Sequence, residues 1–216
     1  MSGGENPGEP QPVSEEDAAR GHHYALIGRL FHDAPDSILL AQLCRADAEA
    51  GGDGTPLEQA WQGLRDACGT AYPAVLKQEY DTLFVGVGRS GVTPYTSHYL
   101  RDIFPDRHLV RLRQRLEELG LGRRSAAFEV EDHISGVCDV MRFLIEGARP
   151  LTEQQLFFKE FVYPGGAAFC DAVVGAETAS FYRCVARYAR AFLEIEREAF
   201  EMEDADAPAS DENRSR

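Results

Sequence analysis

The sequence EYDTLF at residues 79–84 lies in an amphipathic helix that ends abruptly in a glycine-rich turn. Its apolar side chains recur at helical spacing and share one face: Leu76, Tyr80, Leu83 and Phe84. The glycines of residues 85–93 permit positive φ angles, and the following proline disfavours helix at the residue before it. The sequence PYTSHY then occupies residues 94–99. These features predict a rigid helix followed by an aromatic-lined loop that can receive an extended, apolar ligand.

The sequence DHI at residues 132–134 opens a second amphipathic helix. Its apolar stripe comprises Ile134, Val137, Cys138, Met141, Leu144 and Ile145, while Asp139, Arg142 and Glu146 are expected to face water. The patterns E-Y-x-x-L-F-x-G and P-Y-x-S-x-Y, together with this Asp-His block, resemble the two signatures of the TorD/DmsD/NarJ-like family of cytoplasmic chaperones for molybdenum-containing redox enzymes. The resemblance covers roughly residues 20–200 and implies one compact helical domain.

Helical periodicity, without sustained β-type alternation, runs through most of the chain. We therefore predict an all-α, single-domain bundle of about eight to ten helices over residues 14–202. Residues 1–13 are predicted to be a disordered tail, and residues 203–216 an acidic, disordered one. The last helix is expected at about residues 179–202, and the sequence YPGG at residues 163–166 is expected to break the preceding helix.

Two helix starts carry capping residues. Ser14 can cap the first helix, with Asp17 three residues later as its acidic partner. Thr55, Pro56 and Glu58 occupy the N-cap, N1 and N3 positions of another helix. These two capping patterns predict where a helix begins from local sequence alone.

The composition restricts the classes of partner. The 216 residues carry a net charge of −14, which argues against a nucleic-acid surface because phosphate contacts need clustered Lys and Arg. An acidic protein favours basic ligands such as an arginine-bearing peptide, although solubility is an alternative reason for the charge. No run approaches the ~18 apolar residues of a membrane span, and the N-terminal segment lacks the features of a secretory signal. We therefore expect a cytoplasmic protein.

Neither catalytic nor metal-binding motifs are apparent. The five cysteines form no C-x-x-C pair and are expected to be reduced thiols packed in the core. His22 and His23 project about 100° apart on a helix, so they cannot easily bind one ion together. The sequence also lacks G-x-S-x-G, the P-loop and H-E-x-x-H motifs. We therefore predict a binding protein that is not an enzyme and that has no catalytic residues, metal or cofactor.

The resemblance implies where a signal peptide binds, because the family's two signatures are associated with that activity. The candidate signal-peptide-binding residues are Tyr80, Phe84, Pro94, Tyr95, Ser97, Tyr99, Glu131, Asp132 and His133. The Asp132 carboxylate is suited to accept hydrogen bonds from an arginine. The alternative is that Asp132 only caps its helix and that His133 is an exposed first-turn residue. Leu83 is assigned to the core.

The resemblance implies a cytoplasmic chaperone that binds the twin-arginine signal peptide or the apo form of a molybdopterin-dependent oxidoreductase. It would hold this client for cofactor insertion before export or assembly. Two alternatives are a guanine-nucleotide-binding switch or enzyme that uses the loop Gly86–Gly91, with weak GTP binding, and a scaffold for the mature enzyme without signal recognition. The sequence leaves open the client and the oligomeric state, a monomer or a dimer that exchanges helices about Gly120–Phe128.

Overall fold

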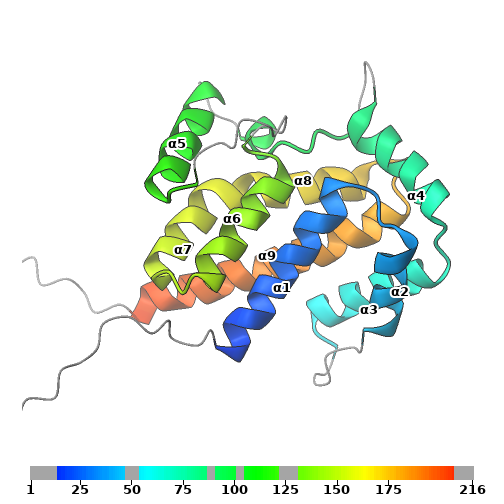
Figure 1. The fold of residues 1–216 in the computed structure, drawn as a ribbon, viewed down its shortest axis with the longest axis horizontal. Coiled ribbons are helices and arrows are strands. Elements are labelled where there is room, and N and C mark those ends of the chain that lie inside the picture. Colours follow the sequence, from blue (N-terminus) through cyan, green and yellow to red (C-terminus); the bar gives the residue numbers. More distant parts are fainter. Residues whose placement is uncertain (1–13, 47–53, 87–90, 101–104, 122–130, 207–216) are drawn as a thin grey trace, which may run out of the picture.

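The computed structural model describes residues 14–46, 54–86, 91–100, 105–121 and 131–206. Within these ranges the chain forms nine α-helices, which confirms the predicted all-α class (Figure 1). They are α1 (Glu15–His32), α2 (Ser37–Arg45), α3 (Pro56–Gly69), α4 (Pro73–Tyr80), α5 (Pro105–Glu118), α6 (Ile134–Glu146), α7 (Leu151–Phe157), α8 (Tyr163–Gly175) and α9 (Phe181–Asp206). The helix α4 continues into a π-helical turn, Asp81–Val85, and a short 3-10 helix spans Thr96–Tyr99.

The core lies between three pairs of helices. The helix α1 packs along α6, while α8 and α3 both pack along the long helix α9 (Figure 1). The apolar stripe predicted for α6 is buried throughout, and Asp139, Arg142 and Glu146 keep 41–64% of their side-chain surface exposed. The amphipathic pattern of α6 therefore correctly predicted which face enters the core.

Both predicted caps are confirmed. Ser14 accepts a hydrogen bond from the backbone N–H of Asp17 at 3.0 Å and is the N-cap of α1. Thr55 and Glu58 form a reciprocal capping box at the start of α3, with Pro56 in the first turn. Each arrangement satisfies backbone N–H groups that a helix start otherwise leaves unpaired.

The predicted break at residues 163–166 is wrong. The helix α7, a π-helical turn at Phe158–Val162 and α8 follow one another without interruption. Pro164 lies in the first turn of α8, where a missing N–H is tolerated. Gly165 is required by a close approach, because a Cβ at this position would lie 2.4 Å from the carbonyl oxygen of Thr96. The glycine thus allows a loop to lie against the helix.

Other boundaries also differ from the predictions. The last helix spans Phe181–Asp206 and is therefore longer at its C-terminus than expected. Cys68, Cys138 and Cys170 are buried as predicted, whereas Cys44 is exposed, so the assignment of all five thiols to the core is wrong. The predicted tails up to residue 13 and from residue 207, and most of the glycine loop and of the proposed hinge, lie outside the described residues. None of the helices in the described ranges is both long and apolar enough to span a membrane.

Candidate partner-binding site

The two sequence motifs meet at the start of α6. Tyr95 and His133 form an isolated antiparallel β-bridge. The N–H of Thr96 donates to the carbonyl oxygen of Asp132 at 2.9 Å, and the N–H of Ile134 donates to that of Pro94, also at 2.9 Å. Main-chain hydrogen bonds therefore bring together two segments that are far apart in sequence. We call the exposed parts of Tyr95, Ser97 and Glu131 at this junction the motif surface.

Asp132 lies directly beneath the motif surface. Its side chain is only 1% exposed, and Oδ2 accepts a hydrogen bond from the backbone N–H of Ser97 at 3.1 Å. Its other carboxylate oxygen, Oδ1, has no hydrogen-bond partner among the described residues. A buried acceptor without a partner is costly, but this oxygen has less than 1 Å² of accessible surface, so a bound donor reaches it only if the loop that covers it moves.

His133 is the N-cap of α6 and is only 5% exposed. Its Nδ1 accepts a hydrogen bond from the backbone N–H of Ser135 at 3.2 Å, and its ring meets Tyr95 edge-on at 5.6 Å. The alternative in which Asp132 caps α6 and His133 is exposed is therefore wrong. The Asp132 side chain instead binds the first turn of the short 3-10 helix.

The aromatic loop is partly accessible. Tyr95, Ser97 and Tyr99 are all half-buried. Tyr99 donates its hydroxyl to the carbonyl oxygen of Thr93 at 2.8 Å, and its ring contacts Phe169 at 6.1 Å. Burial raises the pKa of Tyr99 to about 12, so its hydroxyl remains a hydrogen-bond donor at neutral pH.

Tyr80 and Phe84 lie in the aromatic core, with 6% and 8% of their surface exposed. Tyr80 donates its hydroxyl to the carbonyl oxygen of His32 at 2.6 Å, which fixes α4 to the end of α1. Phe84 contacts Tyr182 edge-on at 5.1 Å. Pro94 is buried as well. A partner could touch these three predicted residues only if the core opened, and Leu83, at 0% exposure, is a core residue as predicted.

The sequence profile of the family described as "Nitrate reductase delta subunit" matches residues 51–194. This range is two thirds of the chain and contains both motifs. The chain belongs to this family. Nitrate reductase delta subunit proteins are NarJ/TorD-type chaperones that take part in the maturation of redox enzymes and act with molybdoenzyme catalytic subunits. The resemblance drawn from the two motifs is thus confirmed, while no curated protein matches the chain.

In this family member Glu79, the first residue of the EYDTLF motif, has a role that sequence reasoning missed. Its carboxylate accepts hydrogen bonds from the backbone N–H groups of Ser180, Phe181 and Tyr182 at 2.8, 3.2 and 2.9 Å. It therefore caps α9 from a distant segment. No local pattern predicts such a cap, because the acceptor lies about a hundred positions before the donors.

The basic helix α5 was also missed as a neighbour of the site. Arg113 forms an ion pair with Glu131, with 3.2 Å between Nη2 and Oε2, so α5 borders the motif surface. On another side of α5, Arg115 pairs with Glu153 at 2.9 Å, and Arg111 pairs with Glu160. The arginines at every second position of α5 are apparent in the sequence and mark a basic helix. The sequence does not indicate with which glutamates they form ion pairs.

Proposed function

We propose that this chain is a cytoplasmic maturation chaperone that binds the twin-arginine signal peptide of a molybdopterin-dependent oxidoreductase. Binding holds the precursor until its cofactor has been inserted and export or assembly can follow. The supporting observation is the bridge between Tyr95 and His133, which unites both family motifs beside a buried carboxylate oxygen of Asp132. The proposed activity is binding and uses no catalytic residue or cofactor.

The chemistry of the motif surface suits such a peptide. A guanidinium group can donate paired hydrogen bonds to a carboxylate, and Glu131 provides one at the motif surface, with the negative charge of the buried Asp132 at the adjacent position. The half-buried rings of Tyr95 and Tyr99 offer apolar area with polar edges for the hydrophobic part of the signal. Burial of ~300 Å² of apolar surface contributes roughly 7 kcal/mol before ordering costs, so we expect micromolar affinity.

The remaining predicted residues support the surface from below in this proposal. Asp132 fixes the loop through Ser97, and His133 positions the Tyr95 ring. Tyr80 and Phe84 fix the helix from which the loop departs. Substitution of these buried residues would therefore change binding through the shape of the surface. Direct contacts are proposed for Tyr95, Ser97, Tyr99 and Glu131, whereas Asp132 acts through its hydrogen bond to Ser97.

The proposal is tested by calorimetric titration of the full chain with synthetic signal peptides from the molybdoenzymes of its own genome. We expect one peptide to bind at micromolar concentration, and Tyr95→Ala and Glu131→Gln each to weaken it at least tenfold. Tyr72→Ala is the matched control for the tyrosine, because Tyr72 is 73% exposed at the distant start of α4. Glu146→Gln, at the far end of α6, is the matched control for the glutamate.

Two results would contradict signal recognition. One is the absence of binding to every peptide by well-folded protein. The other is equal weakening by the control substitutions, which would show a general effect of charge or of apolar area. Titration with the mature catalytic subunit, from which the signal has been deleted, then tests the alternative of a scaffold without signal recognition.

A further inference from the structure

The helix α5 carries arginines on two faces. Arg111 and Arg115 are four residues apart and therefore share one face, whereas Arg113 lies about 200° away from Arg111 around the helix. Leu112, between them in sequence, is fully buried. The helix thus presents an apolar edge to the body of the molecule with basic side chains on both flanks.

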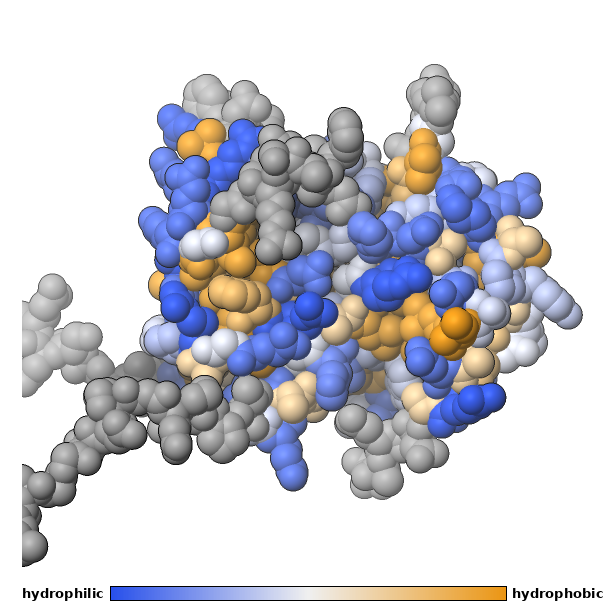
Figure 2. Space-filling model, in the orientation of Figure 1, coloured by the Kyte–Doolittle hydropathy of each residue, from blue (hydrophilic) through white to orange (hydrophobic). Residues whose placement is uncertain are grey.

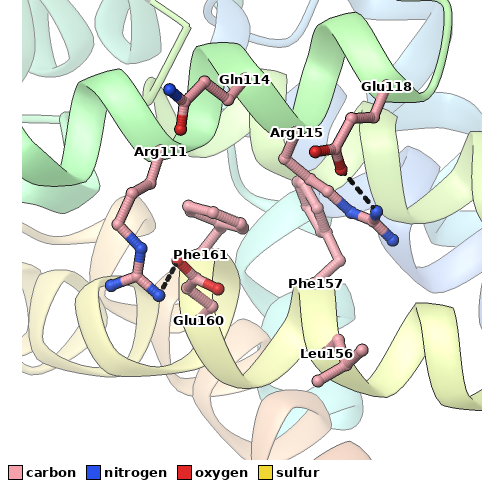
Figure 3. A pocket seen from close by; sticks show the side chains of 8 residues that line it. All are labelled: Arg111, Gln114, Arg115, Glu118, Leu156, Phe157, Glu160 and Phe161. Atoms are coloured by element: carbon pink, nitrogen blue, oxygen red, sulfur yellow. Dashed lines mark hydrogen bonds and ion pairs between the residues drawn. The ribbon is translucent and has the colours of Figure 1, made fainter.

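Each flank of α5 meets carboxylates held by the rest of the molecule. Arg111 pairs with Glu160 of the π-helical turn (Figure 3), and Arg115 pairs with Glu153 of α7 at 2.9 Å. On the other flank, Arg113 pairs with Glu131 at 3.2 Å. Glu131 is therefore part of both the α5 contact and the motif surface. The two surfaces are continuous.

The floor of this contact is aromatic. The rings of Phe157 and Phe161 point toward α5 from α7 and the π-helical turn (Figure 3). Apolar residues gather beside α5 over α6 and α7, with charged residues around them (Figure 2). The groove left between α5 and α7 measures about 240 Å³, which is below the ~300–1,000 Å³ of ordinary small-ligand pockets. A peptide helix can occupy this floor only if α5 moves away.

Two of the three ion pairs that fasten α5 have an exposed arginine, whereas Arg115 and Glu153 are only 23% and 18% exposed. Arg111 keeps 63% of its side-chain surface exposed and Arg113 keeps 51%. Exposed ion pairs stabilise a contact only weakly and exchange readily for other charged partners. At Glu131 and Glu160, another guanidinium group can therefore replace that of the α5 arginine with little change in electrostatic energy.

We propose that α5 is an internal occupant of the surface on which the client's arginine-bearing apolar helix docks, and that the client displaces it. This inference rests on the proposed function. It commits to an arginine-bearing helix because α5 itself shows what the surface accepts: the buried Leu112, the His108 ring at 5.3 Å from that of Phe161, and arginines against Glu131, Glu153 and Glu160. The helix α5 competes with the client, which lowers the affinity for peptides that lack the matching arginines.

The test removes the ion pairs that fix α5 to the rest of the molecule and measures the affinity for the signal peptide. The triple variant Arg111→Gln/Arg113→Gln/Arg115→Gln removes the three ion pairs but retains the buried leucine. Removing positive charge alone would attract a basic peptide, so a matched triple variant, Arg29→Gln/Arg142→Gln/Arg187→Gln, makes the same charge change away from α5. Circular dichroism and thermal unfolding establish that both proteins are folded. Each is titrated with the signal peptide that the wild-type chain binds, and amide hydrogen exchange of residues 107–119 is followed with and without peptide.

We expect the α5 triple variant to bind the peptide at least fivefold more tightly than the matched triple variant. In the wild-type chain, saturation with peptide should accelerate exchange across α5 at least tenfold. Equal affinity of the two triple variants, or unchanged or slower exchange in α5, overturns the internal-occupant inference and leaves signal recognition intact. Absence of peptide binding by the wild-type chain and both variants contradicts the proposed function, and the inference falls with it.

Discussion

Gly165 shows how the absence of a side chain at one position allows the site loop to lie where it does. The carbonyl oxygen of Thr96 lies where a Cβ on Gly165 would be, so the loop that carries Tyr95 and Ser97 rests directly on α8. Thr96 itself is fully buried and bonds to the carbonyl oxygen of Asp132 through both its N–H and its hydroxyl. A displacement at this contact would therefore reach the motif surface without touching any partner-facing residue.

Gly165→Ala is expected to destabilise the protein by about 1–3 kcal/mol, because the new methyl group clashes with backbone that cannot rotate away. Gly175→Ala on the same helix is the control, since nothing lies within 4 Å of a Cβ there. Urea unfolding of both variants measures the difference. If the two variants are equally stable, the close approach of Thr96 is not a constraint.

The helix α9 is fixed in place by hydrogen bonds with side chains of other helices. Glu79 of α4 caps its N-terminus, and Tyr163 of α8 donates a hydrogen bond to Glu194 near its middle at 3.0 Å. Glu194 also forms ion pairs with Arg190 and Arg197 of α9 itself. The position of α9 relative to α4 and α8 therefore depends on polar contacts as well as on apolar packing.

Glu79→Gln should reduce the free energy of unfolding by about 1 kcal/mol, because it removes the charge that caps three backbone N–H groups of α9. Chemical denaturation provides the measurement. Glu177→Gln is the matched control: this exposed glutamate lies close to the same helix start but is not one of the capping residues. A loss as large in the control would mean that general charge near α9, and not the direct hydrogen bonds, is responsible.

Glu194 makes stability depend on pH. Partial burial opposes its charged form, but hydrogen bonds from Arg190, Arg197 and Tyr163 outweigh burial and lower the pKa of the carboxyl from 4.5 to about 2. A lowered pKa in the folded state stabilises the protein above pH 4.5, and this contribution is lost as the pH falls toward about 2.

Glu194→Gln should therefore cost about 1 kcal/mol at neutral pH, a modest value because the side chain is one-third exposed. The difference from wild type should shrink as the pH falls below 4.5. Denaturation curves at several pH values, with Glu198→Gln as a more exposed control, check this dependence. A difference that stays constant with pH would contradict the role of the lowered pKa.

The molecule as a whole is tied together by a buried ion pair between its first and last helices. Arg20 of α1 donates from Nε and Nη2 to the two carboxylate oxygens of Glu196 on α9, at 2.8 and 3.0 Å. Tyr24 donates its hydroxyl to the same carboxylate at 2.9 Å. Glu196 is 3% exposed, so these hydrogen bonds replace those that water would make to its carboxylate.

Glu196→Ala should destabilise the protein by about 2–3 kcal/mol, because it leaves the largely buried Arg20 guanidinium with only the more exposed Asp17 as a counter-charge. The double variant Arg20→Ala/Glu196→Ala should recover part of this loss, since no buried charge remains unpaired. Thermal and urea unfolding of the single and double variants give the coupling energy. Additive losses would show that the two residues act independently.

Much of the architecture could be predicted from local pattern. The caps at Ser14 and Thr55, the buried stripe of α6 and the family motifs all depend on residues within a few positions of one another. Spacings of three and four residues place side chains on one helical face, whatever surrounds the helix. Those features therefore follow from the amino-acid order alone.

The candidate site depended on contacts between distant segments. The bridge from Tyr95 to His133, the cap from Glu79 to α9 and the ion pair of Arg113 with Glu131 join residues that have no local relation in sequence. The sequence pattern around Tyr80 is the same whether the apolar face of its helix binds a partner or packs in the core. The packing of α4 against α1 and α9 decided that it is buried, because burial is a property of the assembled helices and not of any one of them.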